Sequence, residues 1–135
     1  MEWTYPLIGM IVGHGIDIAS IPRIERSLER FAERFLQRCF TQREQDYAQG
    51  RRRPATHLAG RFAAKEAVLK ALGTGWRSGI AWTDIEILSL PTGEPALTLH
   101  GMAARIAEER GATRWWISIS HTEDHVIASA IATSD

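Results

Sequence analysis

The sequence predicts an α+β fold in which a mostly antiparallel sheet packs against helices. Three observations carry this prediction: a glycine-interrupted apolar segment at residues 10–18, two helical patterns after it, and several short strand-like segments in the second half of the chain. With 135 residues, of which 44% are apolar and 24% charged, the chain is long enough for one domain with a real core.

The first half is predicted to contain a strand and two helices. Residues 10–18 are typical of a buried strand, and a helix follows that runs to about Arg38. Ser20 can cap this helix and Pro22 suits its first turn. A second helix over residues 55–72 is expected to end at the glycines that follow it. The core face of the first helix is formed by Ile24, Leu28, Phe31 and Phe35.

The second half is predicted to return to strands. Residues 80–90 and 96–100 flank a turn-forming segment and indicate a hairpin. An alanine-rich helix over residues 101–110 follows. Two further strands, at residues 115–120 and 126–133, enclose a polar turn and complete the antiparallel sheet.

Composition excludes several classes of protein. No segment approaches the roughly 18 apolar residues of a membrane span. The N-terminus lacks the pattern of a signal peptide, and the single cysteine, Cys39, cannot form an internal disulfide, so a cytoplasmic protein is expected. Net charge is zero, but residues 10–75 carry 12 basic and 7 acidic side chains. This uneven distribution predicts a basic face that could attract an anionic molecule or an acidic protein.

Glu66 is chemically awkward in its predicted helix. It lies beside an apolar arc formed by Leu58, Phe62 and Leu69, where an unpaired carboxylate would be costly. The carboxylate must therefore be hydrogen-bonded, paired or bound to a metal. Lys70, four residues further on, could supply an ordinary ion pair.

Asp17 is a second unusually placed carboxylate. Gly13 and Gly15 precede it and permit a close backbone approach. A dinucleotide-binding fingerprint is excluded, because no third glycine opens a helix. Asp17 alone could be a turn or cap residue. Together with Glu66 it forms a possible Mg²⁺ site, since this ion is often held by one or two carboxylates and by substrate phosphates.

The order and spacing of several motifs resemble one enzyme family. These motifs are Gly15-Ile-Asp17, Gly60-Arg-Phe-Ala-Ala-Lys-Glu-Ala67 with Lys70, Gly73-Thr-Gly75, Trp82-Thr-Asp-Ile-Glu86, Gly93-Glu-Pro95 and Ser118-Ile-Ser-His-Thr122. The chain is similar in them to the holo-(acyl-carrier-protein) synthases, which are small 4′-phosphopantetheinyl transferases. The resemblance runs from Met10 to the C-terminus, so residues 1–9 are expected to be an extension of a single domain, residues 10–135.

The resemblance implies the family's fold and its activity. The activity is Mg²⁺-dependent transfer of phosphopantetheine from coenzyme A to a serine of an acyl carrier protein, in fatty acid biosynthesis, with release of 3′,5′-ADP. Asp17 and Glu66 match the metal-binding carboxylates, and Lys70 would neutralise the phosphates. Glu66 is also a candidate base for the serine proton. The expected coenzyme A contacts are Arg61, His121, Thr122, Gly93 and Pro95.

The arginines of the first helix predict a docking surface. Arg23, Arg26, Arg30 and Arg34 fall within an arc of about 80° on a continuous helix. Acidic neighbours could make this an ordinary solvated face. The family resemblance instead favours docking of the acidic carrier protein, mainly through Arg23, Arg26 and Arg30.

One further expectation concerns the oligomeric state, and three alternatives concern the function. Family members of this size resemble homotrimers with shared active sites, so a homotrimer is expected. The carrier could belong to polyketide or other secondary metabolism. In a different class, the chain could be a binding module that holds nucleic acid through its arginines and Arg51–Arg53, which its neutral charge and few interleaved aromatics disfavour. A catalytically inactive carrier-binding protein is disfavoured because both carboxylates and Lys70 are present.

Overall fold

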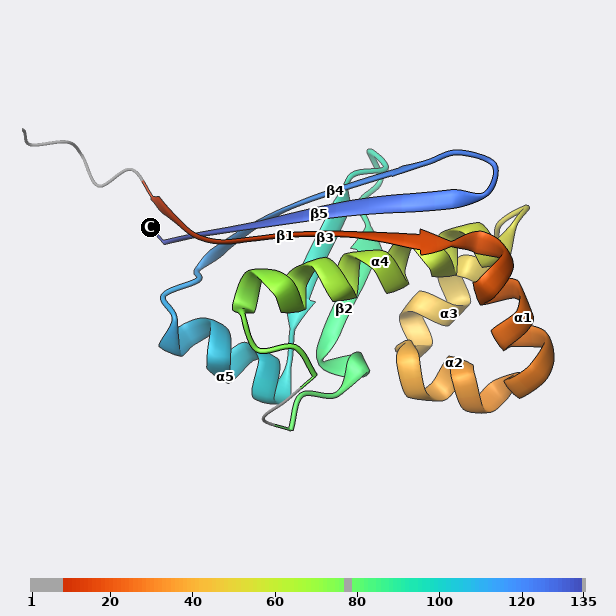
Figure 1. Ribbon diagram of the computed structural model, residues 1–135, viewed down its shortest axis with the longest axis horizontal. Helices are drawn as coiled ribbons and strands as arrows, with labels where there is room; N and C mark the ends of the chain where they lie inside the picture. Colours follow the sequence, from red (N-terminus) through yellow and green to blue (C-terminus); the bar gives the residue numbers. More distant parts are fainter. Residues whose placement is uncertain (1–8, 77–78, 135) are drawn as a thin grey trace, which may run out of the picture.

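A computed structural model describes residues 9–76 and 79–134 and confirms the predicted α+β class. Strands β1 (Met10–Ser20), β5 (His125–Ser134) and β4 (Arg114–His121) form an antiparallel sheet in the order β1-β5-β4. Strands β2 (Ile85–Ser89) and β3 (Pro95–Leu99) form a separate antiparallel hairpin. Figure 1 shows the long helix α4 lying along the three-stranded sheet, with α1 to α3 gathered at one end of the molecule. The expected extension, residues 1–9, lies outside the described residues apart from Gly9.

Helix α4 (Pro54–Leu72) is the centre of the molecule. Pro54 opens its first turn, and Gly73 ends it in the left-handed conformation, with φ of 77° and its N–H donating to the carbonyls of Leu69 and Lys70. The helix is buried on almost every side, because the sheet covers one flank and α1, α3 and β2 pack on the others. Its apolar surface is therefore broader than the narrow arc that the sequence predicts.

Strand β1 lies unusually close to α4, as its two glycines predict. A Cβ atom added to Gly13 would lie 2.2 Å from the carbonyl oxygen of Ala71, and one added to Gly15 would lie 1.9 Å from that of Ala67. Only glycine permits this approach. The contact places the strand segment that carries Asp17 directly on the helix that carries Glu66.

The first predicted helix is in fact two. Helix α1 (Ile21–Phe31) is capped by Ser20, as expected, but ends at Ala32, whose φ of 44° and ψ of −121° interrupt the helix. Helix α2 (Glu33–Cys39) follows in a new direction, and α3 (Gln42–Gln49) begins with a capping box at Thr41. The prediction of one continuous helix to Arg38 is therefore wrong. The sequence gives no warning of the break, because no glycine or proline lies at this point.

The second half follows the predicted order with shifted bounds. The predicted strand at residues 80–90 begins only at Ile85, because the segment Trp82–Asp84 forms a 3₁₀ turn whose Asp84 side chain accepts a hydrogen bond from the backbone N–H of Ala81. Helix α5 (Gly101–Glu109) and strands β4 and β5 lie where they are predicted. Among the described helices, none is long and apolar enough to cross a bilayer.

One face of the three-stranded sheet is not buried. The inner face, which includes Val126 and Ala128, packs on α4. The outer face exposes large apolar side chains: Ile16 is 50% exposed, Ile18 63% and Trp116 52%. In a single chain, the prediction that residues 10–18 form a buried strand is therefore correct for only one face of that strand.

Candidate active site

The structure brings Asp17 and Glu66 together. Asp17 lies within β1, paired with Ala128 and pointing to the inner side of the sheet, so it is neither a turn nor a cap residue. Glu66 lies on the neighbouring face of α4. Burial raises the pKa of the Glu66 carboxyl group, and the negative charge of Asp17 raises it further. The two carboxylates therefore share one electrostatic environment.

Lys70 joins this pair through Asp17 and not through Glu66. Its Nζ donates to Asp17 Oδ1 at 3.1 Å and to the carbonyl oxygen of Ile16 at 2.8 Å. Its charge also partly opposes the rise in the pKa of Glu66. The ion pair between Glu66 and Lys70 within the helix, which their spacing in the sequence allows, is not formed between these two described residues. Glu66 instead accepts a hydrogen bond from the indole Nε1 of Trp76, at 3.3 Å.

The donor set suits a hard divalent cation such as Mg²⁺. Two carboxylates supply hard oxygen ligands, and one ammonium group lies beside them. Within residues 9–76 and 79–134, no cluster of three or more His, Cys, Asp or Glu side chains forms a complete metal cage. The pair is thus suited to Mg²⁺ that takes its remaining ligands from water and phosphate, and unsuited to a closed structural metal site.

Arg61, in the N-terminal half of α4, belongs to a second cluster, which includes Tyr47 of α3 and Ser89 of β2. Only 5% of its surface is exposed, and its Nη2 donates to Ser89 Oγ at 2.9 Å. Its guanidinium lies over the ring of Tyr47, 4.4 Å from the centroid. Its Nε has no hydrogen-bond partner among the described residues. Burial lowers the pKa of this guanidinium, which indicates an environment that would favour an anionic partner.

A pocket of about 500 Å³ lies beside Tyr47 and Ser89, the two residues that Arg61 contacts. Tyr47 and Ser89 form part of its lining, and the Arg51 side chain stacks on Tyr47 at its rim. Gly93, in the turn between β2 and β3 with φ of 89°, also lines the pocket, whereas Pro95, which begins β3, does not. The remaining lining residues are Leu90, Pro91 and Thr92.

His121 and Thr122 lie at the hairpin between β4 and β5. Thr122 donates its N–H to the carbonyl of His125 and accepts from the N–H of His125 through its hydroxyl. Burial lowers the pKa of His57, near the start of α4, and the charges of Arg61, Arg51 and His121 lower it further. Within the described residues, no hydrogen bond or ion pair links His121, Thr122 or Arg61 to the two carboxylates. The predicted coenzyme A contacts of one chain therefore form separate groups.

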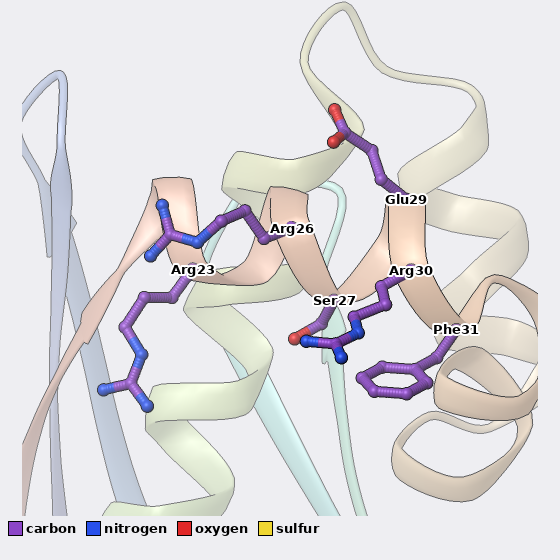
Figure 2. A pocket seen from close by; sticks show the side chains of 6 residues that line it. All are labelled: Arg23, Arg26, Ser27, Glu29, Arg30 and Phe31. Carbon is purple, nitrogen blue, oxygen red and sulfur yellow. The ribbon is translucent and has the colours of Figure 1, made fainter.

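The predicted docking arginines form an exposed surface. Arg23, Arg26 and Arg30 line a groove of about 520 Å³ on α1, and Figure 2 shows Glu29 pointing away from Arg30 and Phe31. The break at Ala32 carries Arg34 onto α2, so the predicted four-residue arc does not form on one helix. Arg34 instead lines an adjacent groove of about 490 Å³ whose apolar floor contains Phe31, Phe35, Phe62 and Trp82.

Two features of the site region escape sequence reasoning. Lys65 and Glu44, both fully buried, form an ion pair of 2.8 Å that joins α4 to α3. Trp76 contacts Glu66 from beyond the end of α4. Only the burial of Lys65 could have been predicted from the sequence. A lysine in a helix whose surface is apolar on nearly every side requires a buried partner.

Comparison with known proteins defines the class of this fold and site. The sequence profile of the 4′-phosphopantetheinyl transferase superfamily matches residues 13–130. A holo-[acyl-carrier-protein] synthase of Koribacter versatilis is 47% identical over 122 residues, 90% of this chain and 98% of the relative. The chain therefore belongs to the 4′-phosphopantetheinyl transferase superfamily, within its holo-[acyl-carrier-protein] synthase family, which confirms the resemblance.

Solved structures agree with this assignment. The holo-[acyl-carrier-protein] synthase of Neisseria meningitidis superimposes with a TM-score of 0.83 at 39% identity, covering 91% of this chain and 98% of that one. The corresponding synthase of Bacillus anthracis, in complex with coenzyme A (3′,5′-ADP), gives a TM-score of 0.78 at 35% identity, covering 93% and 99%. The shared architecture extends over almost the whole domain.

Proposed function

We propose that this protein transfers 4′-phosphopantetheine from coenzyme A to a serine of an apo acyl carrier protein. The products are the holo carrier protein and 3′,5′-ADP. The observation that carries the proposal is the convergence of Asp17 and Glu66, with Lys70 beside them, on a fold whose relatives include a synthase in complex with coenzyme A.

In this reaction the serine oxygen forms a bond to the β-phosphorus, and the bond from that phosphorus to the bridging oxygen breaks. Asp17 and Glu66 would hold Mg²⁺, which when bound neutralises charge on the diphosphate. Lys70 supplies a further positive charge to the same phosphates. Glu66, whose pKa burial raises, is the candidate base that would accept the serine proton.

The adenosine end of coenzyme A would occupy the pocket lined by Tyr47, Ser89 and Gly93. The buried guanidinium of Arg61 contacts Tyr47 and Ser89 behind the pocket wall, and its positive charge supports binding of a phosphate group there. Gly93 and Pro95 would border the base. His121 and Thr122 would contact the phosphates as well. Because one chain leaves these groups apart from the carboxylates, we infer that neighbouring subunits supply some of them.

A homotrimer would provide those neighbouring subunits. The outer face of the sheet exposes Ile16, Ile18, Trp116 and Ile127, and an apolar patch of this kind marks an interaction surface. Burying it against other copies would remove the apolar side chains from water, worth about 25 cal/mol per Å². Sedimentation at micromolar concentration tests this: a monomer that retains full activity would contradict the shared site.

The carrier protein would dock on α1. Arg23, Arg26 and Arg30 supply positive charge for an acidic partner, and the neighbouring apolar groove could accept an apolar side chain from it. We place the reaction in fatty acid biosynthesis in the cytoplasm, where a free thiol such as that of Cys39 stays reduced.

The decisive experiment measures the mass of the carrier protein. Purified protein is incubated with coenzyme A, Mg²⁺ and an apo acyl carrier protein, and mass spectrometry follows the gain of one phosphopantetheine arm. Glu66→Gln and Asp17→Asn should nearly abolish this gain while the protein stays folded, and chelation of the metal should do the same. Glu109→Gln, an exposed carboxylate on α5, serves as the matched control and should keep full activity.

Two outcomes would change the proposal. Full turnover by Glu66→Gln would show that the carboxylate pair does not carry the reaction. A preference for apo carriers of polyketide or other secondary metabolism would keep the chemistry and replace the physiological partner.

A further inference from the structure

A side chain that the proposed reaction does not use lies against one of its carboxylates. Trp76, beyond the C-terminal end of α4, donates its indole N–H to Glu66 Oε1 at 3.3 Å. Glu66 is only partly buried, and a glutamate side chain without a fixed partner samples several rotamers. Restricting such a side chain costs about 1.5–2 kcal/mol of conformational entropy. A partner that selects one rotamer beforehand reduces the cost that remains when a ligand binds.

Trp76 is itself held in place by an aromatic row. Its ring packs on Trp82, with centroids 3.8 Å apart, and Trp82 stacks on Phe62 at 4.6 Å. Phe62 and Glu66 are four residues apart on α4, so they lie on the same side of this helix. The row therefore runs from Phe62 through Trp82 and Trp76 back to Glu66, and the indole cannot move away from Glu66 without losing its ring contact with Trp82.

The middle of this row is anchored in the core. Lys65 Nζ donates to the backbone carbonyl oxygen of Trp82 at 3.0 Å and forms the fully buried ion pair with Glu44. The carbonyl oxygen of Ile85, at the start of β2, also accepts from Lys65. Breaking the buried pair would leave an uncompensated charge, so this anchor is costly to disrupt. It holds the backbone of Trp82, on whose ring the Trp76 indole packs.

We propose that Trp76 is a positioning residue that orients the Glu66 carboxylate for a divalent cation. This inference rests on the metal site of the proposed function. The indole N–H engages Oε1 and leaves Oε2 available to the cation. Because the donor is neutral, it orients the carboxylate without the charge repulsion that an ammonium group would exert on the metal. Hydrogen-bond partners of metal ligands typically contribute about 10–100-fold to metal affinity.

The test measures metal binding without turnover. Free Mn²⁺ is followed by electron paramagnetic resonance while it is titrated into protein and coenzyme A, with no carrier protein present. Trp76→Phe keeps an aromatic ring on Trp82 but removes the donor, and should raise the Mn²⁺ dissociation constant about 10-fold. Trp115→Phe removes an indole from β4, beside β3 and α5, and should leave the constant unchanged.

A second readout separates positioning from a general structural effect. In the transfer assay, Trp76→Phe should raise the Mg²⁺ concentration needed for half-maximal rate, while kcat at saturating Mg²⁺ stays close to the wild-type value. A merely structural role would lower the melting temperature and the rate at every Mg²⁺ concentration. Trp76 is only partly buried, so the variant is expected to fold, which a metal-free thermal melt verifies.

The outcomes distinguish this inference from the proposed function. If Glu66→Gln loses Mn²⁺ binding but Trp76→Phe binds like the wild type, Trp76 has no positioning role and the metal site stands. Tighter binding by Trp76→Phe would mean that the indole competes with the cation, which also overturns the inference. If Glu66→Gln and the wild type bind Mn²⁺ equally, the metal site itself is wrong and the inference falls with it.

Discussion

Replacement of Gly15 by alanine should damage stability and activity together, because β1 touches α4 at this point. The added Cβ would lie 1.9 Å from the carbonyl oxygen of Ala67, whereas real Cβ contacts essentially never fall below 3.0 Å. Strand and helix would have to separate by at least 1.1 Å, the difference between these distances. The obstacle is backbone and cannot rotate away. We expect a loss of about 3 kcal/mol of unfolding free energy, the upper part of the range for overpacked cores.

The same displacement moves Asp17 relative to Glu66. A misplacement of about 1 Å can cost about 100-fold in rate, so the folded fraction of Gly15→Ala should transfer phosphopantetheine far more slowly than the wild type. Unfolding in guanidinium chloride measures the stability, and the gain in mass of the carrier protein measures the activity. Gly50→Ala is the matched control: its φ is −78° and the nearest atom is 3.7 Å away, so a change of under about 0.5 kcal/mol is expected. Unaltered unfolding of Gly15→Ala would refute the close approach.

Two further perturbations probe the core and the docking surface. Lys65→Met leaves the buried Glu44 carboxylate without its ion-pair partner and should lower the unfolding free energy by about 3–5 kcal/mol, measured in urea. The double variant Glu44→Gln/Lys65→Met removes the unpaired charge and keeps a side-chain oxygen that can accept from the backbone N–H of Ile87. It should recover part of this loss, and no recovery would mean that the unpaired charge is not the cause. Arg30→Glu should raise the KM for carrier protein at low ionic strength, with little effect on coenzyme A use. An equal effect at high salt would contradict electrostatic docking.

The carboxylate pair could be predicted because its chemistry is visible in the sequence. Glu66 stands beside an apolar arc where a free charge is costly, and Asp17 follows two glycines that permit close approach. Both arguments depend on local spacing, and both agree with the structure. The pairing of Lys70 with Asp17, 53 residues away, is a property of the strand–helix contact and is absent from the helical pattern itself.

Other features depend on contacts that local patterns do not encode. The break at Ala32 occurs at a residue that favours helices, so propensity opposes the observed bend. The outer face of β1 carries the apolar side chains of Ile16 and Ile18, so the pattern predicts burial without telling which chain provides it. The approach of Trp76 to Glu66 depends on the path of the chain after Gly73, which spacing alone cannot determine.

Lys65 and Glu66 are neighbours in the chain, yet one is fully buried beside Glu44 and the other is half-buried near Asp17 and Trp76. Successive helical residues are turned by about 100°, so a one-residue deletion within the first turns of α4 would swing both side chains out of their surroundings at once. The ammonium would leave its interior partner, and the carboxylate would leave Asp17. This helix therefore tolerates substitution far better than it tolerates any change in length.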